Sequence, residues 1–178
     1  MIENAERTTE LSLMKLYLLR HGIAVDHIGG EITSDWQRPL TKEGREETSQ
    51  VALALAKIGV KANLIVSSPL VRARQTAEIV LAILAKGTEL QITEALAPGG
   101  TASDLYKFLT PFAQLEEIFL VGHEPDMGRL ASTLLWAGEL NITFKKAGVC
   151  RIDLVNLPPS RPGILKWFVT PKILCAIA

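Results

Sequence analysis

The sequence predicts an α/β protein in which helices cover both faces of a mostly parallel central sheet, a three-layer α/β/α sandwich. Short apolar runs are typical of strands that are buried on both faces. Longer segments between them carry apolar residues at helical spacing. The two patterns alternate along a chain of 178 residues, a length that favours a single domain.

The first strand is expected at residues 16–19, an apolar run followed directly by Arg20, His21 and Gly22. A polar segment with one tryptophan, 24–39, then reads as a loop. A loop of this length is often a substrate rim, and the alternative is an ordinary solvated connection.

A helix, a strand and a second helix follow this loop. Thr41 suits the N-cap of a helix that runs to about residue 58, because apolar residues recur there at helical spacing. Residues 63–66 predict a short apolar strand. Ser68 before Pro69 suits an N-cap with proline at the first helical position, which predicts a second helix from Pro69.

The second half continues the alternation until the period changes. Thr101 and Asp104 have the spacing of a capping box, at the start of a short helix that Pro111 ends. A further helix should end at Gly138, and from Ala147 apolar and polar residues alternate as in a half-buried strand. The remaining strands are expected at 90–93, 118–121 and 164–169.

The composition excludes several classes of partner. Lys+Arg equals Asp+Glu, so the net charge is zero and a general nucleic-acid or polybasic membrane surface is not expected. No run reaches the roughly 18 apolar residues that a membrane span needs. A local basic pocket is compatible with this balance.

Residues 1–12 are expected to form a flexible N-terminal extension without the features of a secretory signal, ahead of one domain at 13–178. Cys150 and Cys175 are too few and too distant for a disulfide framework, which favours reduced thiols in a cytoplasmic protein. Cys150 lies in an apolar strand pattern, where an inert core thiol is expected. Histidines and cysteines do not cluster at metal-ligand spacing, so neither a metal nor a cofactor is expected.

Three of the expected strands end in polar residues. The first delivers Arg20 and His21, the second leads through two serines to Arg72, and the third delivers His123. Each alone has an ordinary explanation, such as a solvated charge or a histidine bonded to a backbone carbonyl. Because the carboxyl ends of parallel strands meet at one edge of a sheet, we expect the four side chains to converge there.

Two arginines and two histidines in one pocket suit a phosphate dianion. The planar guanidinium group donates paired hydrogen bonds to phosphoryl oxygens, and nearby helix N-termini add partial positive charge. A neutral imidazole can attack phosphorus and form a covalent phosphohistidine, which splits one difficult displacement into two. Magnesium sites use carboxylates, and no obvious carboxylate pair flanks these clusters.

The three clusters resemble the motifs of the histidine phosphatase superfamily, in its phosphoglycerate-mutase-like branch. They occupy residues 19–22, 67–77 and 122–126. Within the superfamily the chain is similar to the small SixA-type phosphohistidine phosphatases, on the further evidence of residues 34–41 and 145–149. The resemblance extends over nearly the whole chain beyond its first residues.

The resemblance implies a phosphoglycerate-mutase-like fold and a role for each matching residue. His21 matches the nucleophile that becomes phosphorylated. Arg20, Arg72 and His123 match the other members of the phosphate pocket, and Gly22 is expected beside them as a further substrate-binding residue.

In many members of the superfamily a carboxylic acid protonates the leaving oxygen, but no residue of this chain clearly matches that acid. Glu94 lies in the right region without the usual acidic motif, Asp35 and Asp126 are rivals, and the chain could lack such an acid. General acid catalysis contributes about 10²–10⁴-fold. Because an imidazole leaves more readily than an alkoxide, a phosphohistidine substrate should depend less on this acid.

These expectations define a metal-independent phosphatase that hydrolyses phosphohistidine on a protein, such as a phosphotransfer domain, through a phosphorylated His21. The sequence has no long insertion that would form a lid, which indicates a pocket open to a side chain of another protein. Two alternatives are a phosphatase of small phosphomonoesters and a phosphate-binding module without turnover.

Overall fold

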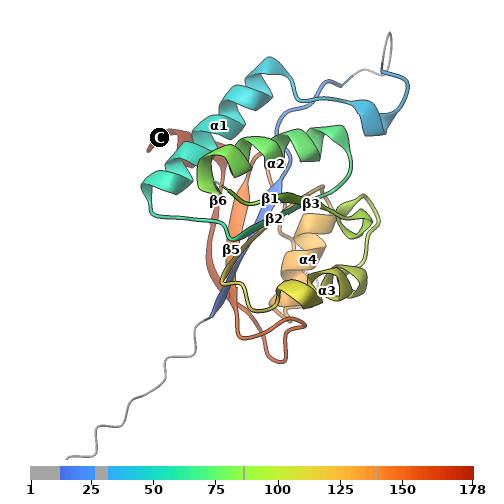
Figure 1. Cartoon of the computed structure of the whole chain (residues 1–178), viewed down its shortest axis with the longest axis vertical. Helices are drawn as coiled ribbons and strands as arrows, with labels where there is room; N and C mark the ends of the chain where they lie inside the picture. Colours follow the sequence, from blue (N-terminus) through green and yellow to red (C-terminus); the bar gives the residue numbers. More distant parts are fainter. Residues whose placement is uncertain (1–12, 27–31, 86, 139) are drawn as a thin grey trace, which may run out of the picture.

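The computed structural model describes residues 13–26, 32–85, 87–138 and 140–178. These residues form one six-stranded sheet between two layers of helices, which is the predicted α/β/α sandwich (Figure 1). The expected N-terminal extension, residues 1–12, lies outside the described residues. No helix in these described ranges is long and apolar enough to cross a membrane.

The strands of the sheet are β1 (Met14–Arg20), β2 (Leu64–Ser67), β3 (Leu90–Ile92), β4 (Glu117–Gly122), β5 (Val149–Leu154) and β6 (Ile164–Val169). Their order is β3-β2-β4-β1-β5-β6. The first four are mutually parallel, and β5 runs antiparallel to both β1 and β6. The sheet is therefore mostly parallel, as predicted, and β1, β2 and β4 have their carboxyl ends at one edge.

The helices are α1 (Lys42–Lys57), α2 (Val71–Leu84), α3 (Ala102–Leu109), α4 (Asp126–Leu134) and α5 (Pro171–Cys175), with short 3-10 helices η1 (Asp35–Gln37), η2 (Glu94–Leu96) and η3 (Thr110–Phe112). Two predicted N-caps are confirmed. Thr41 Oγ1 accepts a hydrogen bond from the Gly44 amide at 2.9 Å, and Thr101 Oγ1 accepts one from the Asp104 amide at 3.1 Å.

The predicted start of the second helix is wrong. α2 begins at Val71 rather than Pro69, and its N-cap residue, Leu70, makes no side-chain cap. Ser68 does not cap the helix, because its hydroxyl lies 2.8 Å from His123 Nε2 and accepts from the Leu70 amide at 3.3 Å. The serine hydroxyl therefore contacts His123 at the edge of the sheet and does not cap the helix.

Three further elements differ from the prediction. α4 ends at Leu134, well before Gly138, and Trp136 beyond it adopts a left-handed φ of 51°. The alternating strand, β5, is not half-buried: Asp153 is buried and forms a two-point ion pair with Arg151 at 2.7 and 2.8 Å. α5 was not predicted, because its five residues are too few to show a helical period.

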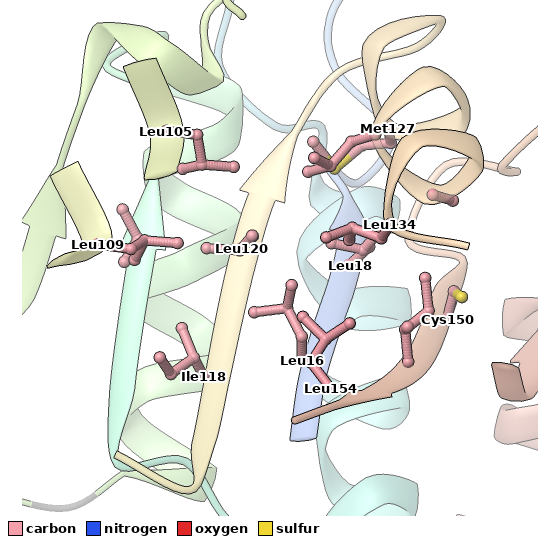
Figure 2. Close-up of a cluster of buried hydrophobic side chains, with 14 of the residues drawn as sticks. Leu16, Leu18, Leu105, Leu109, Ile118, Leu120, Met127, Leu134, Cys150 and Leu154 are labelled. Atoms are coloured by element: carbon pink, nitrogen blue, oxygen red, sulfur yellow. The ribbon is translucent and has the colours of Figure 1, made fainter. Parts of the chain in front are cut away.

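β1 is buried on both faces, which explains its continuous apolar sequence. Leu16 and Leu18 belong to the buried cluster that includes side chains of α3 and α4, and Figure 2 shows Leu18 beside Leu134 of α4. Tyr17 and Leu19 belong to the cluster on the other face, with side chains of α1 and α2. Burial of each such leucine stabilises the fold by about 1.5–3 kcal/mol. β1 therefore ends in a rigid position from which Arg20 and the residue after it emerge.

Cys150 on β5 lies in the core beside these leucines (Figure 2). It is fully buried, and this burial raises its pKa to about 12. The thiol is thus protonated and inert, as the sequence predicted.

The backbone after β1 is held closely by α1. A Cβ at Gly44 would lie well inside van der Waals contact of the Ile23 carbonyl oxygen. The same oxygen accepts a hydrogen bond from the Thr41 amide at 2.9 Å. Glycine at position 44 therefore allows the first turn of α1 to fix the segment that follows His21.

We expect Gly44→Ala to lower the free energy of unfolding by about 1–3 kcal/mol, because the added methyl group must displace backbone. In an unconstrained helix the same change would stabilise by about 1 kcal/mol. Urea denaturation measures the difference, and Gln50→Ala on the exposed face of α1 is the control, with a change within about 0.5 kcal/mol. A Gly44→Ala protein as stable as the native one would show that the close approach is absent.

Candidate active site

The parallel register brings three strand ends together. Arg20 of β1 lies opposite Gly122 of β4, and Ser67 of β2 lies opposite Val121. The ladder continues beyond the strands, because the His21 amide donates to the Gly122 carbonyl oxygen at 3.0 Å and the Ser68 amide donates to the Val121 carbonyl oxygen at 3.0 Å. The residues after β1, β2 and β4 therefore stand side by side at one edge, as predicted.

His21 is held with one ring nitrogen free of protons. Its Nδ1 lies 2.7 Å from the Gly22 carbonyl oxygen, and because a carbonyl only accepts, Nδ1 carries the hydrogen. Nε2 then has a lone pair, and Arg72 Nε donates to it at 3.3 Å. This is the tautomer in which Nε2 can act as a nucleophile.

The pKa of His21 is lowered from its ordinary value of 6.5 to about 3. Burial of the ring is the main cause, and the positive charges of Arg72 and Arg20 and the neighbouring His123 lower it further, against the hydrogen bond to Gly22. The imidazole is therefore neutral at physiological pH.

His123, between β4 and α4, lies against His21, with the two ring centroids 5.0 Å apart. Its Nε2 is 2.8 Å from Ser68 Oγ, while its Nδ1 is buried without a hydrogen-bond partner among the described residues. Burial and then the charge of Arg72 lower its pKa to about 4. Both histidines are thus neutral in the same pocket.

Arg72 lies in the first turn of α2 and joins the site to the loop after β1. Its Nη1 donates to the Asp35 backbone oxygen at 2.7 Å and its Nη2 to Asp35 Oδ2 at 2.9 Å. Arg38 Nη1 donates to the other carboxylate oxygen, Oδ1, at 2.7 Å. This contact favours the interpretation of the loop as a rim of the site.

Arg20 is anchored by a residue that the sequence did not point to. Its Nη1 donates to the Phe144 carbonyl oxygen at 2.6 Å, and its Nε is buried without a partner among the described residues. Burial lowers the pKa of Arg20, and the charge of Glu124 opposes this. Glu124 Oε1 in turn accepts from the Phe144 amide at 2.6 Å, so the three residues form one support.

Gly22 makes its polar contacts with the protein itself. Its amide donates to Thr76 Oγ1 at 3.0 Å, and a Cβ in its place would lie 2.5 Å from Thr48 Oγ1. Its carbonyl oxygen fixes the tautomer of His21. A direct contact of Gly22 with substrate stays a prediction.

The three candidate acids occupy different settings. Partial burial would raise the pKa of Asp35, but the hydrogen bonds from Arg38 and Arg72 outweigh it and lower this pKa, so Asp35 is ionised. Asp126 accepts from the Gly99 amide at 3.0 Å and from Arg129 Nη1 at 3.1 Å. Glu94 is exposed at the start of η2. In the described part of the chain no three His, Cys, Asp or Glu residues group as metal ligands would.

Sequence reasoning missed the supporting groups, for two reasons. Ser68 was recognised as a polar strand-end residue but interpreted as a helix cap, since both roles suit a serine before proline. Phe144 acts through its backbone oxygen, which leaves no trace in residue type. Of these supporting groups, only Glu124 could have been suspected from the sequence, because it is a carboxylate directly after His123.

Together these groups can bind a tetrahedral oxyanion. Two cationic side chains lie beside two neutral imidazoles, and Arg20 Nε and His123 Nδ1 retain hydrogen-bonding capacity. His21 Nε2, which is unprotonated and accepts from Arg72 Nε, could act as a nucleophile in the same place.

Comparisons with known proteins show which family the chain resembles. The model of the histidine phosphatase superfamily (branch 1) matches residues 16–98, a range that includes His21 and Arg72. An uncharacterised protein of Picosynechococcus sp. is 39% identical over 140 residues, which cover 76% of this chain and 82% of that protein. The phosphohistidine phosphatase SixA of Escherichia coli is 27% identical over 160 residues, covering 89% of this chain and 94% of that protein.

A solved structure extends the similarity to the fold. The protein histidine phosphatase SixA complexed with tungstate superposes with a TM-score of 0.78 at 26% identity, covering 90% of this chain and 99% of that chain. His123 lies outside the range that the family model matches, but the fold brings it to His21. The motifs, their order along the chain and the shared fold agree, and the chain belongs to the histidine phosphatase superfamily.

Proposed function

We propose that the protein is a phosphohistidine phosphatase that removes phosphate from a His-phosphorylated signalling or phosphotransfer protein. The observation that carries the proposal is the state of His21, a neutral imidazole whose Nδ1–H is held by the Gly22 carbonyl, which leaves Nε2 unprotonated and hydrogen-bonded only to the Arg72 Nε–H donor among the described residues. A module that only binds phosphate would need the arginines but not this nucleophile.

In the first step His21 Nε2 attacks phosphorus and forms a new N–P bond, while the bond from phosphorus to the leaving imidazole breaks. The electron pair of the broken bond stays on the leaving nitrogen, and the leaving ring takes a proton from solvent, so it departs as a neutral imidazole. Arg20, Arg72 and His123 hold the equatorial oxygens and stabilise the charge as the phosphoryl group moves between the two nitrogens.

In the second step water attacks the phosphorylated His21. The N–P bond breaks, its electron pair returns to Nε2, and inorganic phosphate leaves. Nδ1 stays hydrogen-bonded to Gly22 throughout, so the ring regains the same tautomer for the next cycle. Side chains supply the positive charge in both steps, so the proposed chemistry needs no metal ion.

The state of the carboxylates around the site supports a phosphohistidine substrate. Asp35 is kept ionised by its two arginine partners, which lower its pKa, so it is not prepared to donate a proton. Both carboxylate oxygens of Asp126 already accept hydrogen bonds, from the Gly99 amide and from Arg129. An imidazole leaving group depends on that proton less than an alkoxide does. The SixA relative is named for the same activity, and the similar solved structure holds tungstate, an oxyanion shaped like phosphate.

The first test compares two substrates. We expect kcat/KM for a phosphorylated histidine-containing phosphotransfer protein to exceed that for p-nitrophenyl phosphate and sugar phosphates by at least about 10²-fold, the lower end of what a missing general acid costs an ester. Release of inorganic phosphate measures both. Faster hydrolysis of the small phosphomonoesters would place the protein among phosphatases of small metabolites.

The control for that comparison is His21→Ala, which should abolish turnover of either substrate while circular dichroism and the unfolding midpoint stay near native. Acid quenching destroys a phosphohistidine, so the intermediate is trapped by an alkaline quench and identified by mass spectrometry on the peptide that contains His21. A native protein that turns over without label at His21 would contradict the mechanism.

A second prediction concerns protonation in the free protein. The rings of His21 and His123 should remain neutral when the pH is lowered from 8 to about 5, since their pKa values are about 3 and 4. Nitrogen-15 chemical shifts of the imidazole rings measure this directly. Titration of either ring near its ordinary value of 6.5 in the folded protein would refute the burial argument.

The low pKa of His21 also makes the folded protein less stable at acidic pH. Between pH 6.5 and about 3 the unfolded chain binds protons that the native His21 does not, so the free energy of unfolding decreases as the pH falls through this range. In concentrated urea both histidines should titrate near the model-peptide value of about 6.5, which serves as the internal control.

Glu94 provides a third test, of the proton donor. Glu94→Gln should change kcat for the phosphohistidine protein by less than about threefold, far below the range of about 10²–10⁴-fold for a general acid. The matched control is Glu89→Gln, which makes the same change at another exposed glutamate nearby in the sequence. A loss of about 10²-fold or more in Glu94→Gln alone would identify Glu94 as the acid.

A further inference from the structure

A cavity of about 540 Å³ lies beside the candidate active site and shares Arg20 with it. We call it the lysine groove. The residues that define it are Arg20, Ile23, Lys145, Lys146, Pro171 and Lys172. It brings together the loop before β5, the start of α5 and the segment after β1, which are distant in sequence.

The charge of the lysine groove is strongly one-sided. Four of its lining side chains are cations, and Glu47 is the single carboxylate among them. Lys145 and Lys172 are exposed and Lys146 is half-buried, and no ion pair joins any of them to the described part of the chain. Since the whole chain has zero net charge, this is a local surplus and not a general property of the surface.

The groove also has an apolar component. Ile23 is half-buried and Pro171 is buried in its wall, and the lysine stems add methylene groups. A small inorganic ion would use none of this surface. A peptide segment that carries both acidic and apolar side chains would use the lysines and the apolar wall together.

Hydrogen bonds connect the lysine groove to the nucleophile. The Ala147 amide lies 3.1 Å from the carbonyl oxygens of both Arg20 and His21, and Arg20 Nη1 donates to the Phe144 carbonyl oxygen at 2.6 Å. Lys145 and Lys146 stand between these two anchored positions in sequence. A ligand in the groove is therefore beside any phosphoryl group on His21.

We propose that the lysine groove binds an acidic segment, with apolar residues, of the phosphorylated protein itself, next to its phosphohistidine. The inference rests on the proposed function and names the partner chemistry for the same site. Complementary charge at an open groove raises the association rate and selects the partner, more than it adds to catalysis.

The first experiment measures binding without turnover. A fluorescent peptide of alternating glutamate and leucine residues is titrated with the native protein at low salt, and fluorescence anisotropy gives the dissociation constant. Lys145→Glu with Lys172→Glu should weaken binding by about tenfold or more, since each reversal of a rim charge contributes several-fold. Equal binding by this variant would overturn the proposal.

The matched control reverses two exposed lysines at the opposite end of the sheet, Lys57→Glu with Lys61→Glu. This double variant has the same change in net charge and should bind the peptide as the native protein does. Equal weakening in both variants would show a general charge effect and contradict a local groove. Tighter binding of a single-stranded RNA or of phosphatidylserine vesicles than of the peptide would assign the groove to another partner.

The second experiment uses turnover. Two phosphohistidine peptides, one flanked by glutamate and leucine and one by glutamine and leucine, are compared at low and high salt. The native protein should prefer the acidic peptide in kcat/KM by about tenfold at low salt, with kcat similar, and the preference should vanish in 0.5 M salt and in the groove variant.

The two readouts separate the possible failures. If the native protein hydrolyses neither peptide but the anisotropy difference is present, the proposed function fails and the groove stands. If it hydrolyses both peptides equally and the groove variant binds as the native protein does, the phosphatase stands and the groove proposal fails.

Discussion

The parallel pairing of β1, β4 and β2 is the constraint on which the site depends. It places the residue after each strand at one level, so that His21, Ser68 and His123 meet without any long-range loop having to fold over them. A slip of the β1–β4 register by one residue would turn His21 toward the opposite face of the sheet. The apolar packing on both faces of β1 excludes that slip, because it would also exchange Leu18 and Tyr17 between the two cores.

Burial at the strand ends then determines the chemistry. The same packing that fixes His21 and His123 removes them from water, and with the arginines nearby this keeps both imidazoles neutral. Arg72 stays buried because its outer nitrogens are satisfied by Asp35 while its Nε faces His21. A pocket with two cations and two uncharged imidazoles is a suitable environment for a dianion and also keeps the imidazole of His21 unprotonated at Nε2.

Much of this was predictable from the sequence, and the exceptions share a cause. The six strands and four longer helices follow from apolar periodicity, and the caps at Thr41 and Thr101 follow from local chemistry. The sequence misled where one residue type serves two roles, as at Ser68, or where an ion pair such as Arg151–Asp153 buries polar residues of an alternating strand. Contacts made by backbone atoms, such as the Phe144 oxygen, carry no signal in residue type.

Arg20 shows how one side chain joins two surfaces. Its hydrogen bond to Phe144 orders the segment that carries the groove lysines, and its buried Nε lies in the pocket of the two histidines. Removing the Arg20 side chain would therefore disturb the pocket of the two histidines and the neighbouring groove together, whereas changes at the exposed Lys145 and Lys172 affect the groove alone. The proposed recognition and the proposed chemistry are thus separable by substitution even though they meet at the end of one strand.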